Sequence, residues 1–214
     1  MGHKKIQEAP KSWPISRKKS KFVVKPSSNL RKGISLLTTL REILNLVQNR
    51  KEAKKIIQEK KVFVNGNPVH DEKIGLTLFD VVSIPQIKKD YKITILENGK
   101  FGAIETKEAS TKISKVINKT KTKGNKIQLN LSDGMNIISD INCKTNDSLV
   151  ISLKDRKAEK CLELKEGKEA MVFAGKHIGE SGSVKKIDLE KKLAILEIAG
   201  KEVNILINQI IVTK

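Results

Sequence analysis

Apolar residues between positions 36 and 48 recur at helical spacing. Ser35 stands directly before them and can cap the first turn of a helix. The repeat follows one face of a period of about 3.6 residues, and its members are Leu36, Leu37, Leu40, Ile43, Leu44 and Val47. The pattern predicts an amphipathic helix over 36–48.

A second helix is predicted to begin after Asn49. Asn49 can cap this helix, and Glu52 occupies the capping-box position in its first turn. Ala53, Ile56 and Ile57 form the apolar face. We therefore expect two consecutive amphipathic helices.

Basic side chains crowd the outer surface of the second helix. Arg50 and Lys54 are one turn apart, as are Lys51 and Lys55. Like charges at this spacing repel each other and weaken a free helix. The crowding favours a face that meets anions, although an ordinary solvated face would show the same pattern.

A hairpin and a strand are predicted next. A β-branched run over 62–64 precedes Asn65 and Gly66, which both tolerate positive φ and together give the strongest short hairpin signal. Pro68 places the returning strand at a sheet edge or shortens it. A further strand is predicted over 78–84 and is stopped by the following proline.

Short β-rich runs separated by turns fill residues 91–168. Strands are predicted over 91–96, 101–104, 127–131 and 149–153. A short helix is predicted over 108–118, and the basic stretch 119–126 has no apolar residue, so a loop is predicted there. Asp133 and Gly134 are typical turn residues. This region is predicted to be a small, mostly β domain.

Residues 169–214 carry five further β-rich runs. Gly175, Gly179 and Gly182 punctuate the first connection between them. The predicted strands cover 170–174, 183–187, 193–198, 203–207 and 210–212. Five short strands in so short a stretch predict a small closed barrel.

The first 35 residues lack helical or strand periodicity beyond one short apolar run, and Pro10, Pro14 and Pro26 interrupt them. In free solution such a segment cannot bury enough surface to offset its ordering entropy. We expect a basic arm that becomes ordered in nucleic acid, with a solvated tail as the alternative. Trp13, the only tryptophan, would either stack on a base or fill a groove on the folded body.

Charge supports this picture of the arm. The 214 residues include 43 Lys and Arg against 24 Asp and Glu, a formal net charge of +19. Residues 1–35 alone hold 10 basic residues and 1 acidic residue. The excess indicates a polyanionic partner. No apolar run approaches the ~18 residues of a membrane span or follows Met1 as in a signal peptide, so we expect neither a membrane partner nor secretion.

Cysteine and histidine provide little chemistry. Cys143 and Cys161 are isolated from each other, and the three histidines are far apart. A closed zinc site needs four ligands, usually in close pairs. We expect two structural thiols in a reducing compartment, and neither a metal ion nor a cofactor.

The stretch 170–184 resembles a KOW motif, which is the loop and flanking strands of a small SH3-like barrel common in ribosomal and transcription-elongation proteins. Its glycines allow tight turns, and Lys176, followed by His177, offers a phosphate contact. A nucleotide-binding P-loop is the competing interpretation, but it requires a helix where strands are predicted here.

The helix pair followed by 61–66 resembles the S4 RNA-binding domain of ribosomal proteins, some synthetases and pseudouridine synthases. In that family the second helix and the turn before it face RNA. The resemblance implies basic RNA contacts at Arg41, Arg50, Lys51, Lys54, Lys55 and Lys61. Lysines suit A-form RNA, which is met through its phosphates and shape.

The order of these parts resembles the S4e family of small-subunit ribosomal proteins of archaea and eukaryotes. The resemblance covers essentially the whole chain and includes the segments 9–15 and 126–136. It implies an α+β multidomain protein with a basic arm over 1–35, an S4-type domain over 36–90, a central β-rich domain over 91–168 and a KOW SH3-like barrel over 169–214.

The family implies a structural constituent of the small ribosomal subunit that binds rRNA and supports assembly and translation in the cytoplasm. Expected partners are small-subunit rRNA and neighbouring ribosomal proteins, with no small-molecule substrate and no catalysis. The full set of expected RNA contacts is Lys4, Lys5, Lys11, Trp13, Arg17, Lys18, Lys19, Lys21, Lys25, Arg31, Lys32, Arg41, Arg50, Lys51, Lys54, Lys55, Lys61, Lys121, Lys123, Lys176 and His177.

Two other function classes stay open. An RNA-modifying enzyme would need a catalytic domain with an acid in a cleft, and the two small β units of 91–214 leave no room for one. Asp133 is the only tempting acid, and it occupies a turn position. The second class is a KOW-bearing transcription or translation factor that binds transiently.

Overall fold

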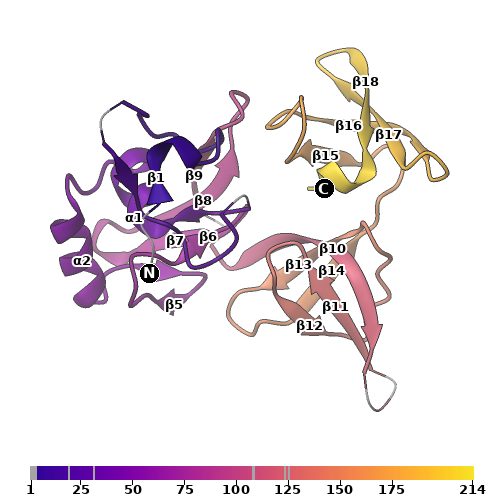
Figure 1. Cartoon of the computed structure of the whole chain (residues 1–214). Helices are drawn as coiled ribbons and strands as arrows, with labels where there is room; N and C mark the ends of the chain where they lie inside the picture. Colours follow the sequence, from indigo (N-terminus) through magenta and orange to yellow (C-terminus); the bar gives the residue numbers. More distant parts are fainter. Residues whose placement is uncertain (1–3, 19, 31, 108, 123, 125) are drawn as a thin grey trace. The chain divides into compact units, whose positions relative to one another are not determined.

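The computed structural model describes residues 4–18, 20–30, 32–107, 109–122, 124 and 126–214 (Figure 1). The chain folds into two compact units, residues 1–110 and residues 111–214. No helix in the described ranges is long and apolar enough to span a bilayer.

The first unit is built on a five-stranded antiparallel sheet in the order β5-β4-β7-β8-β9. Its strands are β4 (Phe63–Val64), β5 (Asn67–Pro68), β7 (Val81–Ile84), β8 (Lys89–Ile95) and β9 (Phe101–Thr106). The predicted hairpin is confirmed, because Asn65 and Gly66 join β4 to β5 with φ of 50° and 76°. Pro68 lies on the edge strand β5, as predicted, where its missing N–H costs no ladder hydrogen bond.

The boundary predicted between residues 90 and 91 cuts through this sheet. It falls inside β8, which pairs with β7 on one side and with β9 on the other. The β-rich segment 91–106 therefore belongs with the helical region and not with a central domain. Alternation of apolar residues identifies a strand, but it carries no information about which neighbour the strand pairs with.

The helices of the first unit are shorter than the apolar pattern predicts. Helix α1 (Leu36–Thr38) continues as the π-helical turn η2 (Thr39–Ile43), and the side chain of Ser35 caps α1 by accepting from the Thr38 amide at 3.3 Å. The predicted helix over 36–48 ends early because Asn45 adopts φ of 51°, a left-handed conformation that asparagine tolerates.

Helix α2 (Arg50–Gln58) begins where predicted. The Asn49 side chain accepts a hydrogen bond from the Glu52 amide at 3.0 Å, which confirms the N-cap. The Glu52 carboxylate in turn accepts from the Gln48 amide at 2.8 Å. Two amide groups at the start of the helix are thus satisfied by side chains.

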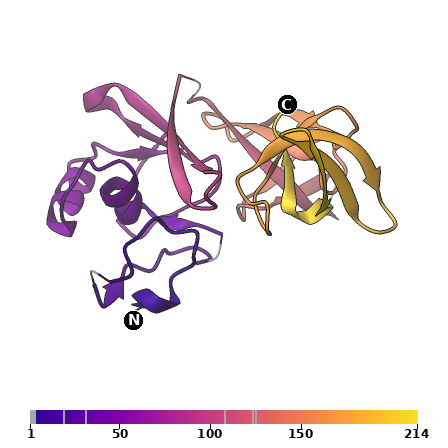
Figure 2. The ribbon, with the colours of Figure 1, turned by 90° about the horizontal axis from the view of Figure 1, so that it is seen from above.

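The described part of the arm, which begins at residue 4, packs against the rest of this unit (Figure 2). Strand β1 (Lys4–Lys5) pairs with β2 (Phe22–Val23), and the 3-10 turn η1 (Ile6–Glu8) follows β1. Trp13 is only 2% exposed, and its indole Nε1 donates to the Gly33 carbonyl at 3.1 Å. The expectation of an arm that becomes ordered only in nucleic acid is wrong for the described residues.

The first unit also contains two short paired strands and a 3-10 turn. Strand β3 (Ile34–Ser35) pairs with β6 (Gly75–Leu76), and the turn η3 (Pro85–Ile87) separates β7 from β8. As predicted, Pro85 ends the strand before it. The β3–β6 pair brings the loop before β6 beside the start of α1.

The second unit contains two antiparallel sheets. The first has the order β12-β11-β10-β13-β14. Its strands are β10 (Thr111–Lys121), β11 (Ile127–Leu131), β12 (Asn136–Ile138), β13 (Ser148–Ser152) and β14 (Ala158–Leu162). The strands predicted over 127–131 and 149–153 are confirmed.

The helix predicted over 108–118 is wrong. Residues 111–118 lie in strand β10, and Glu108 is outside the described residues. The apolar residues Ile113, Val116 and Ile117 imitate helical spacing. Pairing of β10 with both β11 and β13 overrides this local signal. The loop predicted over 119–126 is accordingly shorter, because β10 runs to Lys121.

The second sheet has the order β18-β17-β16-β15-β19. Its strands are β15 (Glu169–Val172), β16 (Ser181–Asp188), β17 (Leu193–Ile198), β18 (Lys201–Leu206) and β19 (Ile210–Val212), and the turn η4 (Ile207–Gln209) joins the last two. All five predicted strands are present. Within residues 169–214 no β18–β19 pair closes the ladder, so the sheet curls around its core without closing into a hydrogen-bonded barrel.

Hydrogen bonds join the two sheets of the second unit. The Lys115 ammonium on β10 donates to the Ile210 carbonyl at 2.8 Å and also to the Ile207 carbonyl. The Val212 amide on β19 donates to the Ser148 hydroxyl at 2.9 Å. The central β-rich domain and the barrel were predicted as separate domains. From residue 111 onward they form one compact unit.

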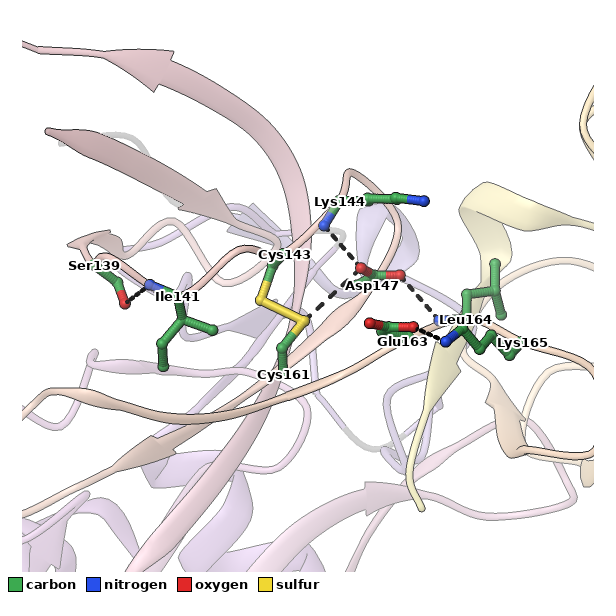
Figure 3. The surroundings of a disulfide bond; sticks show 9 residues. All are labelled: Ser139, Ile141, Cys143, Lys144, Asp147, Cys161, Glu163, Leu164 and Lys165. Atoms are coloured by element: carbon green, nitrogen blue, oxygen red, sulfur yellow. Dashed lines mark hydrogen bonds and ion pairs between the residues drawn. A yellow bond between two sulfur atoms is a disulfide. The ribbon is translucent and has the colours of Figure 1, made fainter. Parts of the chain in front are cut away.

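Cys143 and Cys161 form a disulfide with their Cα atoms 5.9 Å apart (Figure 3). This corrects the expectation of two separate thiols. Cys161 lies on β14, and the loop between β12 and β13 returns to it, where Asp147 accepts hydrogen bonds from the Lys144 and Leu164 amides. A sequence separation of 18 residues does not reveal such a return.

Candidate nucleic-acid interface

Helix α2 presents three lysines on its solvent side. Lys51, Lys54 and Lys55 are exposed, whereas Ala53 and Ile57 on the opposite side are buried in the unit. Among the described residues, none of the three lysines forms an ion pair. The like charges lie within one turn of each other, so a bound polyanion would relieve their repulsion.

Arg50, at the start of α2, has a different role from these lysines. Its guanidinium donates from Nε to the Glu72 carboxylate at 2.8 Å and makes a second, ionic contact from Nη2. The Glu72 side chain is only 3% exposed. The hydrogen bond to Glu72 raises the pKa of Arg50. Arg50 therefore fixes the start of α2 as well as adding positive charge at the surface.

A groove of about 1100 Å³ lies between the arm and the helical turn of the first unit. It brings together four of the expected contacts, Lys4, Lys25, Arg41 and Arg50. It also includes Lys73, a residue that sequence reasoning missed. No periodic signal marks Lys73, and only the β3–β6 pairing places its loop beside the helices.

Ion pairs neutralise part of the charge in the groove. Lys4 pairs with Glu8 and lowers the pKa of that carboxyl, and Arg41 pairs with Glu42 at 2.8 Å. Five basic residues and two acidic residues line the groove, so its net charge is positive. The arrangement suits an anionic ligand that also offers apolar surface.

The other expected contacts of the first unit are dispersed over its surface. Those exposed are Lys5, Lys11, Arg17, Lys18, Lys21 and Lys32. Arg17 also donates to the Ala9 carbonyl at 3.0 Å and so braces the arm. Lys61 is half-buried beside Glu59, its ion-pair partner. Lys19, Arg31 and Lys123 lie outside the described residues.

Trp13 is not available as a stacking platform. Its side chain is enclosed by the core of the first unit, and its one polar atom already has a partner in Gly33. Of the two roles predicted for Trp13, the structure shows the second, in which the side chain fills a groove on the folded body. A buried indole that donates through Nε1 is an ordinary structural arrangement for tryptophan.

The expected contacts in the second unit occupy two places. Lys121 is exposed at the end of β10, and Lys176 is exposed in the loop between β15 and β16. His177 Nδ1 lies 3.0 Å from a Glu180 carboxylate oxygen. Gly175 in this loop has φ of 96°, a left-handed conformation that residues with a side chain rarely adopt, so the loop favours glycine at this position.

Comparison with known proteins identifies the family. Residues 2–28 match the RS4NT (NUC023) domain, and residues 79–158 match Ribosomal family S4e. The small ribosomal subunit protein eS4 of Methanocella arvoryzae is 40% identical over 195 residues, which cover 90% of this chain and 83% of that protein. The chain belongs to the ribosomal S4e family. The eS4 protein of Archaeoglobus fulgidus is 37% identical over 204 residues, covering 94% of this chain and 87% of its own length.

A solved S4e structure has a similar fold. The crystal structure of the 30S ribosomal protein S4e from Thermoplasma acidophilum matches with a TM-score of 0.73 and 26% identity over 85% of this chain and 94% of that one. The resemblance to the S4e family is thus confirmed. S4e proteins are ribosomal structural proteins, which are not a class of enzymes.

Proposed function

We propose that this chain is a structural constituent of the small ribosomal subunit, where it binds rRNA and supports assembly and translation. The observation that carries the proposal is 40% identity, over 90% of the chain, to a protein named for the small ribosomal subunit. Its partners would be rRNA and neighbouring ribosomal proteins in the cytoplasmic ribosome. It needs no cofactor, small-molecule substrate or catalytic residue.

The lysines of α2 would make the main docking contacts of the first unit. The deep major groove of A-form RNA is too narrow for side chains to read, so a protein meets the helix through phosphates and shape. Lys51, Lys54 and Lys55 can reach several phosphates from one rigid helix face. Arg50 would add a contact while its bond to Glu72 holds the helix in place.

The second unit would brace the protein against RNA or neighbouring proteins. The chain over 169–214 is proposed to act as a KOW-type module whose loop offers Lys176 to a phosphate. The glycine at position 175 supports this role because it keeps the backbone turned sharply at the exposed lysine. Lys121, exposed at the end of β10, would serve in the same way.

The docking role of α2 can be tested by salt titration of RNA binding. The full chain and its K51A/K54A/K55A variant are titrated with a small-subunit rRNA transcript at several salt concentrations. Each lost phosphate contact should reduce the slope of log affinity against log salt by about 0.7–0.9. The charge-matched control K154A/K157A/K160A removes three exposed lysines of the second unit and should leave the slope nearly unchanged.

Two results would contradict the proposal. Equal salt slopes in the α2 variant and the wild type would remove α2 from the interface. Absence of the chain from salt-washed small subunits would contradict the structural role itself and would favour a factor that binds transiently.

A further inference from the structure

Phe22 is an aromatic residue held at the surface. All seven aromatic residues of the chain lie in its described part, and Phe22 alone among them is exposed, at 47%. It lies on β2 and lines the groove between the arm and the helical turn. An exposed aromatic ring in a groove is a common feature of a binding site.

Basic side chains surround this ring. The Lys21 ammonium lies 5.7 Å from the ring centroid, and Lys5 is the register partner of Phe22 across the β1–β2 pair. Lys25 and Arg41 line the same groove. The rest of the groove lining includes the apolar residues Ile6, Ile15 and Leu37. The groove thus offers a flat hydrophobic ring together with several cations.

This combination matches the chemistry of an unpaired nucleotide. Every base has a π-face that can stack on an aromatic ring, and the phosphates on either side can meet ammonium and guanidinium groups. Bases within an A-form duplex are already stacked and cannot reach such a ring. The volume of about 1100 Å³ slightly exceeds the range of about 300–1,000 Å³ that is usual for ligand pockets, so more than one nucleotide can enter.

We propose that the groove between the arm and the helical turn binds an unpaired stretch of rRNA, with one base stacked on Phe22 and the adjoining phosphates on Lys25 and Arg41. The proposal rests on the proposed function, because it assumes that the chain binds rRNA. It separates two kinds of contact in the first unit: α2 meets phosphates of a duplex, and the groove holds a single strand. The excess of basic over acidic lining residues favours RNA over a peptide as occupant.

The test compares Phe22→Leu, which keeps apolar surface but removes the ring, with Phe22→Tyr, which keeps the ring. Full-length variants are titrated with a ten-nucleotide oligouridylate and with an RNA duplex of the same strand length. Ile104→Ala is the matched control, because Ile104 is an exposed apolar residue of the first unit that does not line the groove.

Phe22→Leu should weaken binding to the single strand by about 5- to 150-fold, with its salt slope unchanged because the phosphate contacts remain. Phe22→Tyr and Ile104→Ala should stay within about twofold of wild type, and duplex affinity should not change in any variant. A 4-thiouridine placed in the single strand should crosslink to the peptide containing Phe22 in the wild-type protein.

Equal single-strand affinity of Phe22→Leu and wild type would overturn the proposal, as would a loss shared equally by single strand and duplex. If Phe22→Leu kept full RNA affinity but failed to join other ribosomal proteins during subunit reconstitution, the groove would be a protein site instead. A wild-type chain that binds no small-subunit rRNA transcript would refute the proposed function, whereas normal transcript binding with unaltered Phe22→Leu affinity would refute only the stacking site.

Discussion

The indole Nε1 of Trp13 donates a hydrogen bond of 3.1 Å to the carbonyl oxygen of Gly33. This bond joins two positions of the arm that are 20 residues apart, the second of them immediately before β3, and the Trp13 side chain is buried. The arm therefore belongs to the core of the first unit. Its basic side chains are presented from a folded scaffold, which reduces the entropy that RNA binding would otherwise have to overcome.

Replacing Trp13 should loosen the arm. Trp13→Phe removes the N–H donor and leaves the buried Gly33 carbonyl without its partner, which should cost about 1–3 kcal/mol in the free energy of unfolding. Urea titration measures this change. Phe22→Leu, a substitution at an exposed position of the same arm, should change stability by less than about 0.5 kcal/mol. Equal stability of Trp13→Phe and wild type would show that the hydrogen bond makes no net contribution.

Lys115 should make the stability of the second unit depend on pH. Burial lowers its pKa to about 8 from an ordinary value of 10.5. Between these two values the unfolded chain binds more protons than the folded one, so this group's contribution to stability rises as pH increases from about 8 to about 10.5. Urea unfolding of wild type and Lys115→Met across this range should give curves that converge or cross. Parallel curves would contradict a lowered pKa.

Arg50 should contribute more than Lys54 to the stability of the first unit. Arg50→Ala leaves the buried Glu72 carboxylate without its guanidinium and should destabilise the protein by about 1–2 kcal/mol, a value reduced by solvent access to the half-exposed arginine. Lys54→Ala removes one exposed charge from the same helix and should change stability by less than about 0.5 kcal/mol. Chemical denaturation of both variants provides the comparison, and similar losses would mean that Glu72 does not depend on Arg50.

Replacing Gly182 by a residue with a side chain should destabilise the second sheet. A Cβ at this position would lie 2.2 Å from the Glu197 carbonyl oxygen on β17, so Gly182→Ala must push β16 away from its neighbour, at a cost of about 1–3 kcal/mol. Gly200→Ala is the control, because φ is 77° there but no atom lies within 4 Å, which leaves a conformational cost of about 1–2 kcal/mol. Amide exchange at Val184 and Leu196 should accelerate only in Gly182→Ala. Unchanged exchange there would show that β17 adjusts without losing its pairing.

Local signals in the sequence predicted much of the fold. The Asn49 cap, the Asn65–Gly66 turn and the five strands beyond residue 168 depend on neighbouring residues, and all were found. The predictions failed where contacts between segments distant in the sequence determine the structure. Strand β10 has helical spacing locally, and its pairing with β11 and β13 determines its conformation. The pairing of Cys143 with Cys161 likewise depends on a long return of the chain.

The sequence predicted the basic charge of the candidate interface, but it did not predict the groove or all the residues that line it. The basic crowding on α2 follows from the sequence, because a helix places residues three and four apart on one side. Lys73 and Phe22 carry no such pattern and enter the groove only through the packing of the arm against the helical turn. For Trp13 the sequence left base stacking and groove filling equally open, and its size and single polar atom suit the core.

The pairing of β15 with β19 predicts an order for folding of the second sheet. Strands β16, β17 and β18 follow one another and pair as neighbours, so their contacts close short loops and can form early. Ala170 on β15 meets Val212 on β19, 42 positions later, which closes a much longer loop. The carbonyls that receive the Lys115 ammonium lie at Ile207 and Ile210, at the entrance to β19. We therefore expect the Lys115 ammonium to leave water when β19 docks on β15, in the last step. Alkaline pH, which deprotonates this group, should accelerate that step.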